Sequence, residues 1–289
     1  MGDQLSVNQT FVRNFKIDGL DGSAVTCDIF NHDMGEDWRP AFVFVHGGGF
    51  VGGDKDQFFG AASWISLTMG AVCITLQYRT APANVYPAPV IDCLSVFTWL
   101  WNQRELLQIR PEWVCVAGGS PGANIGAMAM MAEEGLLAKY GLNPKGIFQP
   151  RNGIFLNGIY DLADFYERNP EERGRIKAYL DASRFDRRLW REASPVCHRK
   201  AELNLLLLHG SEDVIVPLKQ CGEMKDVAER ERGRVRIRIF EGKPHAWFNE
   251  PQNLYEVLVE IKKYMEEIKR GNLNGTESSK GIISGCDEE

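Results

Sequence analysis

Short apolar runs rich in β-branched residues alternate along the chain with longer amphipathic stretches. This alternation is typical of parallel strands joined by crossover helices, and it predicts a mostly parallel sheet with helices on both faces. The first two strands flank the turn-rich segment 18–22, so we expect them to form an antiparallel hairpin. Strands are predicted at 11–17, 24–30, 41–45, 71–77, 113–117, 153–157, 203–209 and 235–240. Helices are predicted at 58–69, 91–104, 123–133, 218–230 and 254–269.

One segment, residues 161–195, interrupts the alternation. It is charged, contains aromatic residues, and predicts short helices around 161–168, 170–182 and 186–191. Because it lies between two predicted strands, it could fold over the carboxyl edge of the sheet as a small cap, or be a helical excursion without a role in the site. We therefore expect one domain over 1–270 with a cap insertion at 161–195. The tail 271–289 lacks core-forming periodicity and is predicted to be disordered.

Length and composition narrow the classes of protein to consider. The chain has 289 residues, of which 44% are hydrophobic, enough for one large domain. Its net charge of -6 argues against a nucleic-acid partner, which would need a concentrated basic surface. No apolar run approaches the roughly 20 residues that span a bilayer, and the N-terminus lacks the features of a signal peptide. The seven cysteines form no C-x-x-C pair, so we expect buried free thiols, a cytoplasmic protein and no metal site.

The clearest chemical signal is the pentapeptide Gly118-Gly119-Ser120-Pro121-Gly122, which directly follows the apolar run 113–117. A strand that enters a glycine-flanked serine and then a helix is typical of a nucleophile elbow. The turn is so tight that the serine takes strained dihedral angles and its neighbours must be small. Ser120 could instead only cap the helix that begins at Pro121. The pentapeptide alone is a weak signal, so its partners decide the interpretation.

An activated serine needs a base and an acid that orients the base. In folds with this elbow they follow the serine in the order acid, then histidine. The loop after strand 203–209 contains Glu212 and Asp213, and the loop after strand 235–240 contains His245. Asp213 and His245 could each be an ordinary loop residue, and Glu212 is the near alternative to Asp213. Because both loops are expected at the carboxyl edge beside Ser120, the sequence favours a triad of Ser120, His245 and Asp213.

Donors for an oxyanion are predicted in the run Gly47-Gly48-Gly49, which follows His46 at the end of strand 41–45. Consecutive glycines let the backbone approach a ligand and direct N–H groups at one point. A flexible turn is the alternative. It is disfavoured because this fold takes an oxyanion donor from the loop after such a strand. His46 is expected to brace the loop rather than to act on the substrate.

Together these motifs resemble the hormone-sensitive-lipase type of α/β-hydrolase, which includes bacterial carboxylesterases and acetyl esterases. The resemblance implies an α/β-hydrolase fold with an eight-stranded, mostly parallel sheet, and hydrolysis of short-chain, acetyl-type carboxylic esters through an acyl-enzyme, with no cofactor. It covers about residues 38–265. The motifs that carry it are His46-Gly47-Gly48-Gly49, Tyr78-Arg79-Thr80-Ala81-Pro82, Tyr86-Pro87-Ala88-Pro89 with Asp92, Gly118-Gly119-Ser120-Pro121-Gly122 with Asn124, Asp213 and His245.

The resemblance also implies a small-molecule ester as the substrate. Phe50, Trp247 and Phe248 flank the catalytic loops and are the candidates to line its pocket. The alternatives are an acyltransferase, an amide or formamide hydrolase, a lyase, or a non-catalytic binding protein of this fold. The sequence leaves open whether the protein is a monomer or a homodimer.

Pro121 departs from the family pattern. The residue after the nucleophile usually supplies an oxyanion donor through its backbone N–H, which proline lacks. Losing one donor typically costs about 10²–10³ in rate. The family pattern then leaves the N–H groups of Gly48 and Gly49 as two donors. We therefore expect an active hydrolase that is less powerful or has a shifted oxyanion site.

Overall fold

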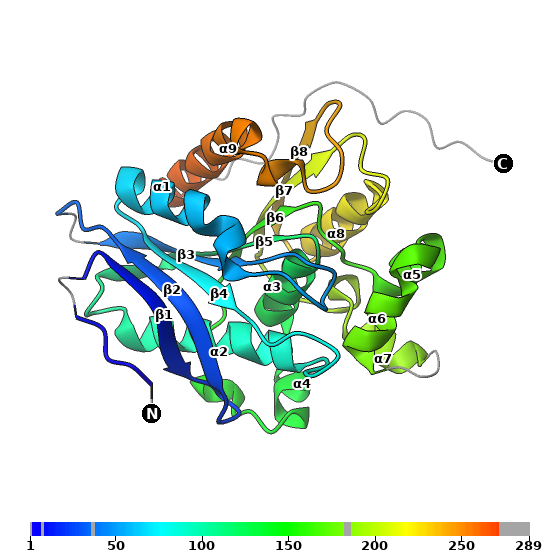
Figure 1. Cartoon of the computed structure of the whole chain (residues 1–289), viewed down its shortest axis with the longest axis horizontal. Coiled ribbons are helices and arrows are strands. Elements are labelled where there is room, and N and C mark those ends of the chain that lie inside the picture. Colours follow the sequence, from blue (N-terminus) through cyan, green and yellow to red (C-terminus); the bar gives the residue numbers. More distant parts are fainter. Residues whose placement is uncertain (1, 7–8, 36–37, 182–185, 272–289) are drawn as a thin grey trace.

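The computed structural model describes residues 2–6, 9–35, 38–181 and 186–271. A sheet of eight strands, in the order β1-β2-β4-β3-β5-β6-β7-β8, runs through the molecule (Figure 1). β1 pairs antiparallel with β2, and β2 with β4, whereas β3 to β8 are parallel. The predicted strands and the N-terminal hairpin are confirmed. The strands are β1 (Phe11–Asp18), β2 (Ala24–Asn31), β3 (Arg39–Val45), β4 (Val72–Gln77), β5 (Ile109–Gly119), β6 (Asn152–Leu156), β7 (Asn204–Gly210) and β8 (Arg234–Phe240).

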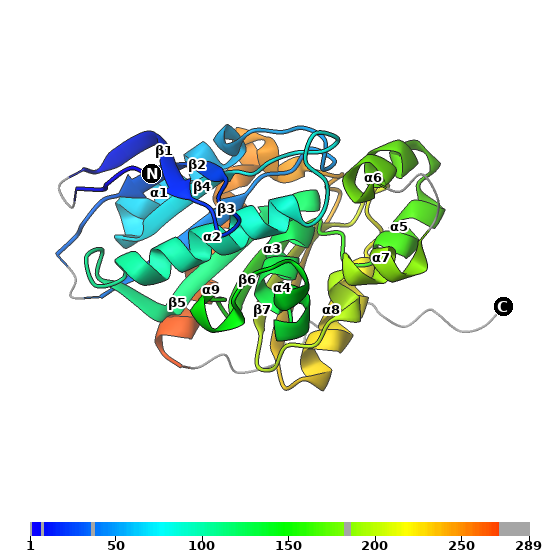
Figure 2. The same ribbon diagram turned by 90° about the horizontal axis from the view of Figure 1, so that it is seen from below.

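Helices cover both faces of the sheet (Figures 1 and 2). α1 and α9 pack on one face, and α2, α3 and α8 pack on the other. On β3, Phe42 and Phe44 belong to the core on the first face and Val43 and Val45 to the core on the second, which explains why the whole strand is apolar. The helices are α1 (Phe59–Met69), α2 (Ala88–Gln103), α3 (Pro121–Met131), α4 (Glu134–Lys139), α5 (Leu162–Arg168), α6 (Arg173–Leu180), α7 (Arg187–Glu192), α8 (Lys219–Arg230) and α9 (Pro251–Lys269).

The helix predicted at 123–133 corresponds to α3, which ends at Met131 because Ala132, with ψ 117, leaves the helical conformation. The separate helix α4, which begins at Glu134, was not predicted. Helix α4 has six residues, too few to show a helical period in the sequence. Short 3-10 turns, which the sequence did not predict, lie at η1 (Lys55–Phe58), η2 (Pro144–Gly146), η3 (Pro170–Glu172), η4 (Pro195–Cys197) and η5 (Trp247–Asn249).

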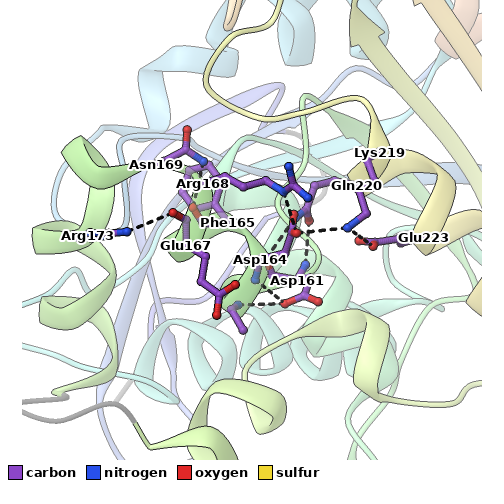
Figure 3. A network of polar contacts seen from close by, with 11 residues as sticks. Asp161, Asp164, Phe165, Glu167, Arg168, Asn169, Arg173, Lys219, Gln220 and Glu223 are labelled. Carbon is purple, nitrogen blue, oxygen red and sulfur yellow. Dashed lines mark hydrogen bonds and ion pairs between the residues drawn. The ribbon is translucent and has the colours of Figure 1, made fainter. Parts of the chain in front are cut away.

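The segment between β6 and β7 contains α5, α6 and α7, close to the predicted helices, and lies to one side of the sheet (Figure 2). A buried side chain of α8, Gln220, anchors its start. The Gln220 Oε1 atom accepts hydrogen bonds from the backbone N–H groups of Tyr160 and Asp161, each 2.7 Å long. Asp164 of α5 pairs with Lys219 of α8 at 3.1 Å (Figure 3). The segment is therefore attached to the main sheet through α8.

The remaining expectations concern the cysteines and the chain ends. Five of the six described cysteines are buried and all six are free, whereas Cys197 is exposed. Cys286 and residues 272–289 of the predicted tail lie outside the described residues. Within the part of the chain that the structure describes, no helix is both long and apolar enough to cross a membrane.

Candidate active site

Ser120 occupies a strained turn between β5 and α3. Its backbone has φ 53 and ψ -119, a conformation that non-glycine residues rarely adopt. Close backbone packing forces this turn. A Cβ atom on Gly122 would lie 2.1 Å from the carbonyl oxygen of Val45, and one on Gly118 would lie 2.4 Å from the carbonyl oxygen of Gly122. The two outer glycines of the pentapeptide are thus required by sterics, and they fix Ser120 at the carboxyl edge of the sheet.

His245 and Asp213 lie in line with Ser120. The Nε2 atom of His245 is 2.9 Å from Ser120 Oγ, and its Nδ1 atom is 2.7 Å from Asp213 Oδ2. Nδ1–H donates to the carboxylate, so Nε2 is free to accept the hydrogen bond of the serine hydroxyl. The Asp213 side chain is 1% exposed and that of His245 is 15% exposed. The arrangement can therefore take a proton from Ser120 and stabilise the resulting imidazolium.

The loops that carry the acid and the base pack directly on each other. A Cβ atom on Gly210, at the end of β7, would lie 2.2 Å from the carbonyl oxygen of Lys243. The backbone N–H of Glu212 donates to the same oxygen at 3.0 Å. Glu212 itself is exposed, whereas the Asp213 carboxylate contacts His245. The geometry thus distinguishes Asp213 from its sequence neighbour.

Hydrogen-bond donors surround the Asp213 carboxylate. Its Oδ1 atom accepts from the backbone N–H groups of Ile215 (2.9 Å) and Val216 (2.8 Å), and the Asn157 amide donates to Oδ2. Burial raises the pKa of Asp213, but the hydrogen bond from His245 and those from Val216 and Asn157 outweigh it and hold the pKa below its usual value. Asn157 was missed in the sequence, although its place directly after β6 puts it at the same edge.

A second histidine, His209, also lies close to the Asp213 carboxylate. Its Nε2 atom is 2.8 Å from the carbonyl oxygen of Val216 and 3.4 Å from Asp213 Oδ2, so Nε2 carries the proton. Its Nδ1 atom is 3.2 Å from the Cys221 sulfur, which can donate its S–H. Burial lowers the pKa of His209 and raises the pKa of Cys221 to about 12, so both are neutral.

The glycine loop after β3 is held by the side chain of Gln57. The Gly47 N–H donates to Gln57 Oε1 at 2.6 Å, and Gln57 Nε2 donates to Asn249 Oδ1 at 2.9 Å. Gly48 and Gly49 have φ 118 and φ 64, and their N–H groups donate to no atom of the described residues. Of the three predicted oxyanion glycines, Gly47 therefore has its N–H engaged, and Gly48 and Gly49 have theirs available.

His46 braces this loop from below. It is fully buried, its ring stacks on Tyr78 at 4.0 Å between centroids, and its Nδ1 atom lies 2.7 Å from the carbonyl oxygen of Gly47. Burial lowers the pKa of His46, which keeps the ring neutral. These contacts are those of a structural residue, as the sequence suggested.

A cavity of about 530 Å³ opens above Ser120 and His245. Phe50 and Phe248, two of the three candidates to line the substrate pocket, lie in its wall. Trp247 does not. It is 2% exposed and packs on the ring of Phe240 at 4.2 Å, because η5 turns it into the core beside α9. No pattern in the sequence indicated the other lining residues, which include Ile159, Phe165, Glu172, Arg175, Ile176 and Ile215.

Among curated proteins, Esterase LipC of Mycobacterium tuberculosis (strain ATCC 25618 / H37Rv) is 26% identical over 212 residues, which are 70% of this chain and 51% of that protein. Carboxylesterase NlhH of the same strain is 33% identical over 96 residues, or 33% of this chain and 30% of that protein. The chain therefore spans about half, or less, of the length of these relatives. Their names agree with the resemblance to hydrolases of the hormone-sensitive-lipase type.

Two solved structures share the fold at low identity. The esterase Est2 of Thermogutta terrifontis with bound propionate gives a TM-score of 0.72 at 20% identity, over 90% of this chain and 96% of that one. An esterase of Pyrobaculum calidifontis gives 0.72 at 20% identity, over 92% and 87%. These likenesses confirm the predicted α/β-hydrolase fold. A family model described as BD-FAE matches residues 27–227, and the chain accordingly belongs to the BD-FAE family.

Proposed function

We propose that the protein is a serine carboxylesterase that hydrolyses short-chain, acetyl-type esters of small molecules. The observation that carries this proposal is the hydrogen-bonded row of Ser120, His245 and Asp213 beneath the cavity. The esterase names of the relatives support it.

In the proposed mechanism, Ser120 Oγ attacks the ester carbonyl while His245 Nε2 takes the hydroxyl proton. The N–H groups of Gly48 and Gly49 stabilise the oxyanion. His245 then protonates the leaving alcohol, and the acyl group stays on Ser120. A water molecule, deprotonated by His245, attacks this acyl-enzyme and releases the acid. Asp213 keeps Nδ1 protonated throughout and stabilises the imidazolium.

The walls of the cavity support the proposed substrate class. Phe50, Phe248, Phe165 and Ile215 offer apolar contacts, and a volume of about 530 Å³ suits a small ester. We further propose that α5, α6 and α7 act as a cap, since Ile176 of α6 is among the lining residues. A cytoplasmic location and a homodimer stay predictions.

The proposal is tested with p-nitrophenyl esters of increasing acyl length, together with labelling by a fluorophosphonate. We expect hydrolysis with a short-chain optimum, and a phosphonyl group on Ser120 in the peptide mass spectrum. Ser120→Ala should lower kcat at least about 10³-fold. Esterase activity that survives Ser120→Ala would overturn the proposal. Product analysis with added alcohols or with anilide substrates separates an acyltransferase or an amidase from an esterase.

A further inference from the structure

One cation reaches the cavity from the α6 helix. Helix α6 carries Arg173, Arg175 and Lys177, and of these Arg175 lines the cavity. A Cβ atom on Gly49 would lie 2.6 Å from Cδ and 3.2 Å from Nε of Arg175. The guanidinium group thus lies directly against the loop whose free N–H groups face the reacting carbonyl in the proposed mechanism.

The other two cations of α6 turn away. The Arg173 guanidinium donates to the carbonyl oxygen of Tyr166 at 3.0 Å. It also donates to the carbonyl oxygen of Glu167 at 3.1 Å (Figure 3). The Lys177 ammonium lies 5.7 Å from the centroid of the Tyr166 ring. Both groups are therefore used within the helical segment itself. Arg173 provides a matched control for Arg175, since it has the same charge and lies two residues away on the same helix.

Helix α6 is firmly attached to the catalytic side of the cavity. The ring of Tyr179 stacks on Phe50 with centroids 4.0 Å apart and planes 15° apart. The backbone N–H of Tyr86 donates to the carbonyl oxygen of Tyr179 at 2.8 Å. Ile176, which follows Arg175, is 1% exposed. These contacts hold the backbone at Arg175 in a fixed place relative to the glycine loop.

The guanidinium group of Arg175 has unused donors. Both carboxylate oxygens of Glu172 accept from the same atom, Nη1, at 2.9 and 3.0 Å. Nε and Nη2 donate to no atom of the described residues, which leaves three N–H bonds in a planar fork. The side chain is 54% exposed, so these donors are open to solvent and to a ligand. A planar fork of this kind matches the geometry of a carboxylate.

Of the other charges in the cavity wall, Glu172 already pairs with Arg175 through Nη1 and leaves Nε and Nη2 for a ligand. Among the described lining residues, Asp54 and Glu172 are the acids and Arg175 is the permanent cation. The Asp54 carboxylate accepts the backbone N–H of Asp56 at 2.8 Å and caps η1. Glu172 orients Arg175 through Nη1. An anionic group bound in the cavity would find its counter-charge at Arg175.

We propose that Arg175 binds a carboxylate carried by the substrate, so that the protein prefers anionic esters such as half-esters of dicarboxylic acids or acyl esters of hydroxy acids. This inference rests on the proposed esterase function and specifies its substrate class. The carboxylate can belong to the acyl part or to the alcohol part, because Arg175 lies beside the glycine loop, which both parts pass.

Two pairs of esters show whether the carboxylate that Arg175 binds belongs to the acyl part or to the alcohol part. Mono-p-nitrophenyl glutarate and its methyl ester differ by a charge on the acyl part, and acetoxybenzoate and its methyl ester differ by a charge on the alcohol part. We expect Arg175→Gln to lower the ratio of kcat/KM, anionic over neutral, about tenfold for at least one pair. Arg175→Lys should lower it less, and Arg173→Gln should keep the wild-type ratio. The wild-type preference should also shrink in high salt.

A ratio that stays the same in Arg175→Gln for both pairs would overturn the inference. An equal loss of kcat for charged and neutral esters would also overturn it, because Arg175 would then act on the shared carbonyl. Binding gives a readout without turnover. In the Ser120→Ala background, Arg175→Gln should raise the Kd of monomethyl glutarate about tenfold and leave that of dimethyl glutarate within about twofold. Failure of the wild type to hydrolyse any ester would reject the esterase function, whereas this binding test would still decide the carboxylate site.

Discussion

The two sides of Ser120 differ in the part that side chains play in holding the backbone. On the side of α3, the nucleophile turn is fixed by backbone sterics, since a Cβ atom on Gly122 would lie 2.1 Å from the Val45 carbonyl oxygen. On the opposite side, the glycine loop is packed as closely at Gly48, where a Cβ atom would clash with the carbonyl oxygen of Gly52, but the Gly47 N–H is held by a side chain, Gln57. The steric contacts allow no substitution of the glycines, whereas the Gln57 contact can be removed without a clash. Substitutions should therefore affect the position of the Ser120 nucleophile differently from the position of the oxyanion donors in the glycine loop.

The largest effect is expected from Gly122→Ala, which acts on the nucleophile turn. The added methyl group meets the backbone of β3, which cannot move without disturbing the centre of the sheet. We expect the free energy of unfolding to fall by about 3 kcal/mol or more, with loss of esterase activity. Chemical denaturation measures the first and hydrolysis of p-nitrophenyl acetate the second.

Gly135→Ala is the matched control for this prediction. Gly135 lies in the helix α4, and a Cβ atom added there would meet no heavy atom within 4 Å. Alanine there should be neutral or stabilise the protein by up to about 1 kcal/mol. Equal stability of the two alanine variants would show that the close approach of Gly122 to Val45 is not what fixes the turn.

Gln57→Leu removes the side-chain hydrogen bond that holds the glycine loop. Without the acceptor, the Gly47 N–H loses its partner and the neighbouring N–H groups of Gly48 and Gly49 lose their fixed direction. We expect kcat to fall about 10- to 100-fold with a smaller change in KM, because the donors act mainly in the transition state. Gln57→Glu keeps an acceptor for Gly47 and loses the donor to Asn249, so its kcat should lie between those of the wild type and Gln57→Leu. Steady-state kinetics on a neutral ester measures all three proteins.

Pro121→Ala tests the comparison from the side of the nucleophile turn, because it adds a possible oxyanion donor there. Alanine restores the backbone N–H that proline lacks at the residue after Ser120. We expect kcat to rise up to about tenfold, and the effect of Gln57→Leu to become smaller in the double variant. Pro144→Ala, at the first position of η2 and outside the cavity lining, should leave kcat unchanged. A Pro121→Ala enzyme that is no faster would indicate that this N–H does not reach the oxyanion.

The sequence was most informative where backbone periodicity or chain order carries the information. Buried parallel strands need continuous apolar runs, so the sheet could be predicted. The position of Ser120, Asp213 and His245 after three strands indicated that they would meet. Gln57 could not be found, because a glutamine in a 3-10 turn has no pattern that distinguishes it from a solvent-exposed one.

The sequence also could not predict which side chains of the helical segment 161–195 line the cavity. Arg175 belongs to a helix with three cations, and only packing decides which of them faces the cavity. Trp247 is the reverse case, because it was predicted to line the pocket and lies in the core. An aromatic residue two positions after the histidine is equally suited to the pocket and to the core, and the turn η5 sends it to Phe240. Periodicity reports the faces of strands and helices, but loop residues are oriented by contacts that the sequence does not display.

The smallest expected effect concerns His209, which lies against the Asp213 carboxylate and belongs to neither the nucleophile turn nor the glycine loop. Burial lowers the pKa of His209 in the folded protein. As the pH falls, His209 is therefore protonated in the unfolded chain before it is protonated in the folded protein. The free energy of unfolding should therefore fall as the pH falls from the unfolded pKa, about 6.5, toward the lower folded value. The slope contributed by one such group is at most about 1.4 kcal/mol per pH unit.

His209→Gln should remove this share of the slope. A glutamine amide can still donate toward the Val216 carbonyl and Asp213, but it does not titrate, so the stability at neutral pH and its pH dependence are separated. The free energy of unfolding, measured by denaturation between about pH 7.5 and 5.5, should depend less on pH in the variant than in the wild type. The remaining slope belongs to other groups, among them His46, whose pKa burial also lowers. Parallel curves for the two proteins would mean that folding does not lower the pKa of His209.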